Sequence, residues 1–122
     1  MFSPKRLLLL SLAVLALAGL ALGQGATGQI TGRVEDAAGA VVPGASVTVT
    51  NLATALRREG ATGDAGDFAF TLLPPGKYKV EVSAKGFKRV VVEELEVNVT
   101  QTATLNLKLE PSSVDETVTV TA

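Results

Sequence analysis

The sequence contains no cysteine, no histidine and no tryptophan. Without cysteine, the chain can form neither a disulfide framework nor a thiolate metal site. Without histidine, it cannot build the histidine-dependent zinc sites or the serine–histidine and cysteine–histidine nucleophile systems. These absences exclude several large classes of enzyme. The residues predict a non-enzymatic protein with no catalytic residue, no metal and no cofactor.

The chain also lacks a concentration of positive charge. Its formal net charge is −1 over 122 residues, and no run of lysine and arginine is longer than two residues. Nucleic-acid-binding domains usually carry a basic patch or stripe, so we expect no nucleic acid partner. The length allows one small domain at most.

The first 23 residues differ in character from the rest. Lys5 and Arg6 precede an apolar run from Leu7 to Leu22, and small residues end this segment before Gln24. This order is typical of a secretory signal peptide, which we predict at 1–23. A retained membrane anchor is the alternative, but the run is shorter than the roughly 20 apolar residues that a spanning helix usually needs. We therefore expect an exported protein, and the absence of cysteine suits the bacterial periplasm.

The remainder of the chain alternates apolar and polar residues with the period of a β-strand. In the clearest case, Ala45 to Thr50, the polar positions are all hydroxyl residues. A weaker segment, Leu56 to Thr62, is interrupted by charge and is expected near a sheet edge. Seven or eight such segments recur with turn signals between them, which predicts a small all-β sandwich. The segments are Ile30–Glu35, Ala45–Thr50, Leu56–Thr62, Asp67–Leu72, Lys77–Ala84, Phe87–Val92 with Leu95–Val99, and Thr102–Leu109.

One stretch, Thr62 to Tyr78, combines several of these signals. Its glycines and aspartates favour a turn. Phe68, Phe70 and Leu72 then alternate with polar or small residues, and Pro74-Pro-Gly ends the strand. We predict that the stretch forms a β-hairpin whose first arm buries these three residues.

The end of the chain departs from the pattern and then returns to it. Pro111 to Asp115 has the composition of a linker. The segment 116–122 alternates again, with valine on one side and threonine on the other. It is either a further sandwich strand or an extended segment that pairs with a partner.

Five motifs, in this order and spacing, resemble the carboxypeptidase regulatory-like domain. The resemblance covers residues 29–110, after a leader at 24–28. It implies an antiparallel β-sandwich of seven, possibly eight, strands, of the transthyretin (prealbumin) type. The same fold is grouped with carbohydrate-binding-like domains. The motifs are Ile30-Thr-Gly-Arg-Val34, Val42-Pro-Gly-Ala-Ser-Val47, Thr62-Gly-Asp-Ala-Gly-Asp-Phe68, Leu73-Pro-Pro-Gly-Lys-Tyr78 and Ala84-Lys-Gly-Phe87.

The tail resembles a TonB box, the segment by which TonB-dependent outer-membrane receptors engage the energy-transducing protein TonB. The resemblance implies a periplasmic N-terminal module of such a receptor, located in the periplasm or at the periplasmic face of the outer membrane of a Gram-negative-type bacterium. We expect the chain to be a fragment, with the receptor's barrel in cis, or a truncated relative. The residues that would contact TonB are Glu116, Thr117, Val118, Thr119, Val120, Thr121 and Ala122.

The alternative function is an independent secreted sandwich that binds a carbohydrate or a protein through its loops. Sugar-binding surfaces generally use exposed aromatic faces, and Tyr78 and Phe87 are the candidates. Both fit core or edge packing better.

Acidic residues offer two further possibilities, each with a simpler interpretation. The calcium-ligand candidates are Asp64 and Asp67, with Asp36 and Glu35 elsewhere. They lack the dense acidic spacing of a calcium loop, and turn formation is the favoured interpretation. The cluster from Glu93 to Glu96 is interpreted as a solvated face.

Overall fold

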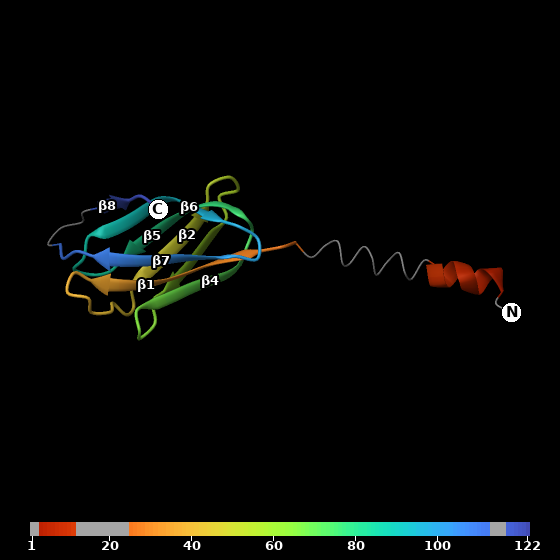
Figure 1. Cartoon of the computed structure of the whole chain (residues 1–122), viewed down its shortest axis with the longest axis horizontal. Helices are drawn as coiled ribbons and strands as arrows, with labels where there is room; N and C mark the ends of the chain where they lie inside the picture. Colours follow the sequence, from red (N-terminus) through yellow and green to blue (C-terminus); the bar gives the residue numbers. More distant parts are fainter. Residues whose placement is uncertain (1–2, 12–24, 113–116) are drawn as a thin grey trace.

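The computed structural model describes residues 3–11, 25–112 and 117–122. Residues 4–11 form a short helix, and within the described ranges no helix is both long and apolar enough to cross a membrane. Of the predicted signal peptide, 1–23, residues 1–2 and 12–23 lie outside the described ranges. Eight strands account for most of the rest (Figure 1). Their bounds are β1 Gly28–Asp36, β2 Ser46–Asn51, β3 Arg57–Ala61, β4 Asp67–Leu73, β5 Gly76–Ser83, β6 Arg89–Val97, β7 Thr102–Leu109 and β8 Thr117–Val120.

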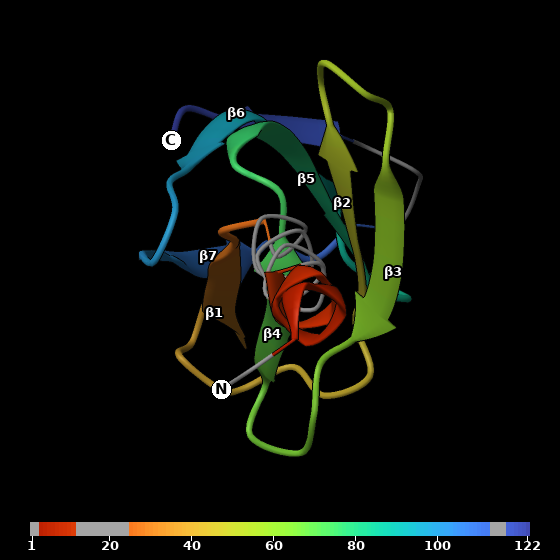
Figure 2. The same cartoon turned by 90° about the vertical axis from the view of Figure 1, so that its right-hand side faces the viewer.

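The strands form two sheets that face each other, so the predicted all-β sandwich is confirmed. One sheet has three strands in the order β4-β1-β7, and the other has five in the order β3-β2-β5-β6-β8. Figure 2 shows the two layers, with the larger sheet curving from β3 to β6. Two pairings, β1 with β7 and β6 with β8, are parallel. The other four described strand pairings are antiparallel, as expected for this sandwich. The two parallel pairings join strands that are distant in sequence, which hairpin geometry does not constrain.

The core lies between the sheets and is built from the apolar side of each alternation. Because successive strand side chains point to opposite faces, the valines of β2 are buried while Thr48 and Thr50 lie half-exposed on the outer face. The aromatic rings of Phe68 and Phe70 pack 6.3 Å apart within the core. Its fully buried large side chains are Tyr78, Ile30, Leu73, Leu109, Val34, Val47, Val49, Val80, Val82, Val92 and Val97.

The predicted hairpin between β4 and β5 does not form. Strand β4 pairs with β1 in the smaller sheet, whereas β5 pairs with β2 and β6 in the larger one. Leu72 has a positive φ of 54° and is 70% exposed, while Leu73 is fully buried. This break in the alternation reverses the face of the strand. Pro74 and Pro75 then supply no N–H donor, so the chain crosses between sheets instead of folding back on β4.

Candidate interaction edge

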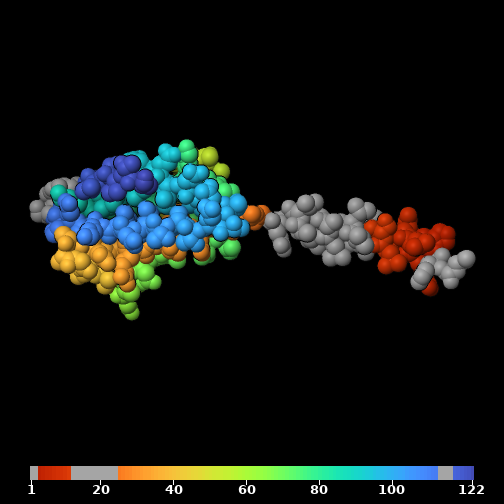
Figure 3. Space-filling model, in the orientation of Figure 1, coloured from red at the N-terminus to blue at the C-terminus, as the bar shows by residue number. Residues whose placement is uncertain are grey.

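The tail strand, β8, forms one edge of the larger sheet. Its four residues pair in parallel with Arg89 to Val92 of β6. Val118 and Val120 are half-buried and Val120 packs against the core, while Thr117 and Thr119 are exposed. The space-filling view shows the tail strand, in dark blue, lying on the surface (Figure 3). The predicted alternation is therefore present, and the segment is a strand of the sandwich in this structure.

The two described residues that follow Glu110 contact the turn between β5 and β6. Pro111 forms a bridge with Phe87, and the N–H of Ser112 donates to the carbonyl of Gly86 at 2.9 Å. The predicted linker 111–115 therefore begins in contact with the domain. Its last residues, and Glu116 of the predicted TonB box, lie outside the described ranges.

Three of the four β6 residues that pair with the tail strand are valines; the fourth is Arg89. Val90, Val91 and Val92 are all buried, and both Val90 and Val92 belong to the core cluster. An uncharged run of this kind at an open sheet edge would invite pairing with another chain. The tail strand occupies this position in cis and covers the run.

Beyond Val92 the character of β6 changes. The described pairing with the tail strand ends at Val120, and an open cleft of about 610 Å³ follows. Its walls come from Glu93 to Glu96 of β6 and from Thr119 to Ala122 of the tail. The sequence offered no signal for this cleft, because it depends on a pairing between segments more than 20 residues apart.

The charges at the cleft are partly neutralised by β5. Lys77 Nζ lies 2.8 Å from Glu94 Oε1. The hydrogen bond that Lys77 donates to Glu94, followed by the negative charges of Glu94 and Glu96, raises the pKa of Lys77 above its ordinary value of 10.5, although desolvation acts in the opposite direction. Glu93 and Glu96 form no ion pair with any described residue. The cleft is therefore acidic overall.

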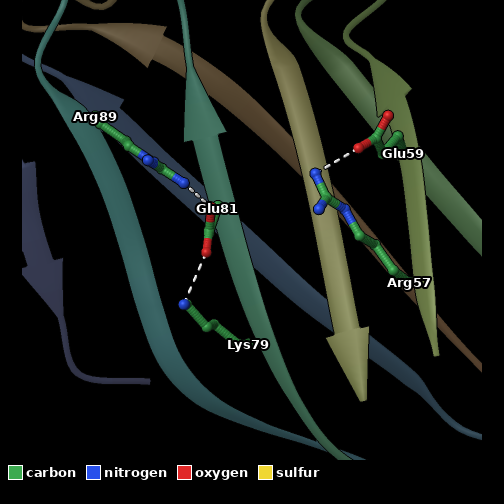
Figure 4. A network of polar contacts seen from close by, with 5 residues as sticks. All are labelled: Arg57, Glu59, Lys79, Glu81 and Arg89. Atoms are coloured by element: carbon green, nitrogen blue, oxygen red, sulfur yellow. Dashed lines mark hydrogen bonds and ion pairs between the residues drawn. The ribbon is translucent and has the colours of Figure 1, made fainter. Parts of the chain in front are cut away.

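The opposite edge of the larger sheet, β3, is charged. Arg57 and Glu59, both on β3, form an ion pair at 2.5 Å (Figure 4). The other charged network in Figure 4 lies in the interior of the sheet, where Lys79 of β5 and Arg89 of β6 both contact Glu81 of β5. Charged side chains on edge strands discourage pairing with other chains.

One residue of β3 also reaches across to the smaller sheet. The guanidinium of Arg58 donates to the carbonyls of Thr71 at 2.6 Å and Leu72 at 3.1 Å, near the end of β4. This edge is therefore both charged and joined to the neighbouring layer.

The acidic residues considered as calcium ligands lie in or next to turns, except Glu35: Asp64 is a turn residue, Asp36 ends β1 and Asp67 begins β4, whereas Glu35 lies within β1. Asp36 Oδ1 accepts hydrogen bonds from the N–H groups of Ala38 and Ala40, each at 2.9 Å. The N–H of Gly63 donates to the carbonyl of Asp67 at 2.9 Å and closes the turn before β4. Among the described residues, no group of three or more acidic side chains is placed to hold a metal. Turn formation, the favoured interpretation, agrees with this geometry.

The aromatic residues considered for sugar binding are not exposed. Tyr78 is fully buried and its hydroxyl donates to the carbonyl of Pro74 at 2.6 Å. Phe87 is half-buried and packs against the core. Throughout 3–11, 25–112 and 117–122, no aromatic side chain is exposed. The interpretation of both rings as packing residues is confirmed.

The sequence did not indicate the roles of two buried polar residues, Thr62 and Asn51. The Thr62 hydroxyl donates to the carbonyl of Val42 at 2.6 Å and accepts from the N–H of Ala45 at 2.8 Å. Asn51 Oδ1 accepts from the N–H groups of Ala53 and Thr54 and holds the turn after β2. Both satisfy backbone groups at loops, so their roles are structural.

A family model described as the carboxypeptidase regulatory-like domain matches residues 29–110. The chain belongs to this family. The matched range coincides with the region predicted from the five motifs, and it ends before the tail strand begins. A comparison with curated protein sequences gives no match.

Several solved structures resemble this regulatory-like domain. The Bacillus anthracis TIE protein is 28% identical with a TM-score of 0.62, over 70% of this chain and 17% of that protein. A protein from Bacteroides uniformis, described as a candidate carbohydrate binder, is 18% identical with a TM-score of 0.59, over 71% and 43%. Hydroxyquinol 1,2-dioxygenase from Pseudomonas putida is 14% identical with a TM-score of 0.56, over 75% and 58%.

These likenesses concern the fold. The chain spans between 17% and 58% of the length of these three proteins. The last two identities are low enough to show a shared architecture alone, and one architecture hosts many functions. The family match shows that the domain resembles a regulatory or binding β-sandwich and not a catalytic domain.

Proposed function

We propose that this regulatory-like domain is the periplasmic N-terminal module of a TonB-dependent outer-membrane receptor. Its role is structural and interactive, and its tail, Glu116 to Ala122, is the segment that engages TonB. The observation that carries the proposal is the position of the tail strand. It is an edge strand, and it lies outside the range that the family shares.

The chemistry of such a contact follows from the backbone. In a strand, N–H and C=O groups point alternately to the two sides, so a strand with one paired side has donors and acceptors on the other. Strand addition uses these groups for affinity and the alternate side chains for specificity. The tail strand pairs with β6 on one side, and its other side ends the sheet as described. A TonB strand would continue the larger sheet at this edge.

The proposed location depends on the N-terminal segment. Lys5, Arg6 and the apolar run that follows have the order of a signal peptide. Export to the periplasm would place the tail on the side of the outer membrane where TonB acts. Expression of the full chain in a Gram-negative host, followed by fractionation and N-terminal sequencing, tests this step. Recovery of the unprocessed chain in the cytoplasm would contradict it.

The direct test of the contact is a calorimetric titration of the protein with a TonB C-terminal domain. We expect binding by the wild-type chain and its loss when residues 116–122 are deleted. The variants Val118→Pro and Thr119→Pro refine the test, because successive N–H groups of a strand point to opposite sides. One of the two prolines therefore removes an outward donor, and that variant should weaken binding at least about tenfold while the melting temperature stays near that of the wild type.

The matched control is Thr119→Ala, which changes the side chain but keeps the backbone N–H. We expect this variant to bind within about twofold of the wild type, because main-chain bonds carry the affinity. Equal binding by the wild type and the deletion variant would contradict the proposed contact. Gene sequence that continues beyond the codon for Ala122 into a plug and a barrel would support the receptor context, and a different continuation would contradict it.

A further inference from the structure

The outer edge of the tail strand and the cleft at its end form one continuous surface, which we name the tail edge. The strand contributes Thr117 to Val120, and the cleft continues from Thr119 to Ala122 and across to Glu93–Glu96. A chain that pairs with the tail strand and runs on in the direction of β6 reaches the cleft next. The surface therefore has two parts of different chemistry, an uncharged backbone edge and an acidic end.

The acidic end has two carboxylates that a positively charged ligand can contact. Glu94 is engaged by Lys77 at 2.8 Å, while Glu93 and Glu96 are exposed and have no ion pair among the described residues. Both carboxylates belong to β6, the strand that supports the tail strand. Their position on the strand next to β8 allows them to meet side chains of an added strand that runs past the end of β8.

We propose that the tail edge selects an extended strand that carries lysine or arginine where it passes the end of β8. Main-chain pairing along Thr117 to Val120 supplies the affinity. The carboxylates of Glu93 and Glu96 select positive side chains and fix the register of the added strand. The inference deepens the proposed function, on which it rests for the identity of the partner as TonB, but the chemistry of the partner comes from this surface.

The two kinds of contact have different effects: main-chain pairs provide affinity, and charged contacts provide selectivity. Main-chain pairing tolerates many sequences and several registers. Complementary charges at the rim of an interface add little affinity but discriminate between partners and registers. Since both carboxylates are exposed, each contact should be weak and sensitive to salt.

The experiment uses two fluorescent peptides and the full chain. Each peptide has a central Thr-Val repeat of about six residues; one is flanked by lysine pairs and the other by glutamate pairs. We expect the lysine peptide to bind about tenfold more tightly at low ionic strength by fluorescence anisotropy. The ratio of the two affinities should fall to about twofold near 0.5 M salt, because salt screens the exposed charges.

Substitutions in the chain test where this preference arises. The double variant Glu93→Gln/Glu96→Gln should lose most of the preference for lysine, with unchanged melting temperature. The matched control is Asp64→Asn, which removes one negative charge at an exposed turn before β4 and should leave both affinities unchanged. The proline variant that removes an outward N–H donor of the tail strand, Val118→Pro or Thr119→Pro, should weaken peptide binding at least about tenfold as well.

The outcomes separate this inference from the proposed function. Equal binding of the two peptides, or a preference that survives Glu93→Gln/Glu96→Gln, would overturn the inference even if TonB binds. Binding of the lysine peptide without any binding of TonB would support the inference and contradict the proposed function. A dimer in sedimentation analysis that the tail-edge proline removes would assign the edge to a second copy of the chain, and would also overturn the inference.

Discussion

The two edges of the five-stranded sheet are built in opposite ways. At one edge, β3 carries two arginines and a glutamate, and Arg58 joins it to the carbonyls of Thr71 and Leu72 in the other sheet. At the other edge, the tail strand consists of threonine and valine and is held by four residue pairs with β6. Edge strands that must remain unpaired usually carry charge or are covered. The β3 edge follows this rule and the tail strand does not.

This difference indicates where the sheet can be extended. A new strand at β3 would have to displace Arg58 and desolvate the ion pair between Arg57 and Glu59. A new strand at the tail edge would meet neutral side chains that favour β-structure. The tail is therefore the edge at which strand addition has the lowest cost, which is the basis of both proposals.

The largest expected effect comes from removing a large core side chain of the central strand, which supports both edges of the sheet. Tyr78 lies on the central strand, β5, and is fully buried with its hydroxyl bonded to Pro74. Tyr78→Ala should lower the free energy of unfolding by about 3–5 kcal/mol, measured by urea denaturation. Tyr78→Phe, which keeps the ring, should cost only about 1 kcal/mol. Similar losses for the two variants would mean that the hydroxyl, not the ring, matters.

The next effect concerns the β3 edge. Arg58→Ala should lower the free energy of unfolding by about 1–2 kcal/mol, because two hydrogen bonds from a charged donor are lost. Arg57→Ala is the matched control; it breaks an exposed ion pair and should cost less than about 0.5 kcal/mol. If the two variants were equally stable in denaturant melts, Arg58 would not join the sheets and the comparison of edges would lose its main support.

A smaller loss of stability is expected at the tail edge. Deleting residues 117–122 uncovers the valine run from Val90 to Val92 but removes only two half-buried side chains, Val118 and Val120. The cost should be about 1 kcal/mol. Self-association should increase because the β6 edge becomes open, and light scattering at matched concentrations measures it. A deletion variant that remains as monomeric as the wild type would show that β6 does not need its cover.

The smallest effect is expected at Lys77, beside the acidic cleft. Glu94 and Glu96 raise its pKa in the folded state above 10.5. The ion pair therefore contributes stability below about pH 10.5, and this contribution is lost as the pH rises through the raised pKa. The difference in stability between the wild type and Lys77→Met should disappear at strongly alkaline pH. Lys85→Met, at an exposed turn lysine, controls for the loss of a lysine. A difference between wild type and Lys77→Met that does not change with pH would contradict the pairing.

Much of the fold could be predicted because the strands and their buried faces follow from the alternation of neighbouring residues. The alternation from Ala45 to Thr50 gives β2 and its buried face, and the charges of Arg57 to Glu59 mark an edge strand. Pairing partners were harder to predict. The Pro74-Pro-Gly turn was interpreted as the turn of a hairpin, but the positive φ of Leu72 sends the chain into the other sheet. The residues around Leu72 do not predict a positive φ at this position, because leucine seldom adopts one.

For the candidate site, too, the sequence predicted the strand itself but not the strand with which it pairs. The threonine–valine alternation of the tail was visible in the sequence, and so was its capacity to form a strand. Its partner strand was not visible, because pairing with β6 joins segments that are distant along the chain. The sequence predicts only a solvated face for the acidic cluster from Glu93 to Glu96. This cluster lines a cleft because the described pairing between β6 and the tail strand ends at Val120.

The sequence by itself determined the family, the β-rich content, the absence of histidine and cysteine chemistry, and the residues that alternate between core and solvent. These properties depend on residue type and short spacing, and local sterics and hydrophobic burial act on them directly. Only the tertiary structure decided which strands meet, that two of the pairings are parallel, and that the tail closes the edge of β6. Pairing is decided by contacts between distant segments, whose closure entropy and packing no local pattern records.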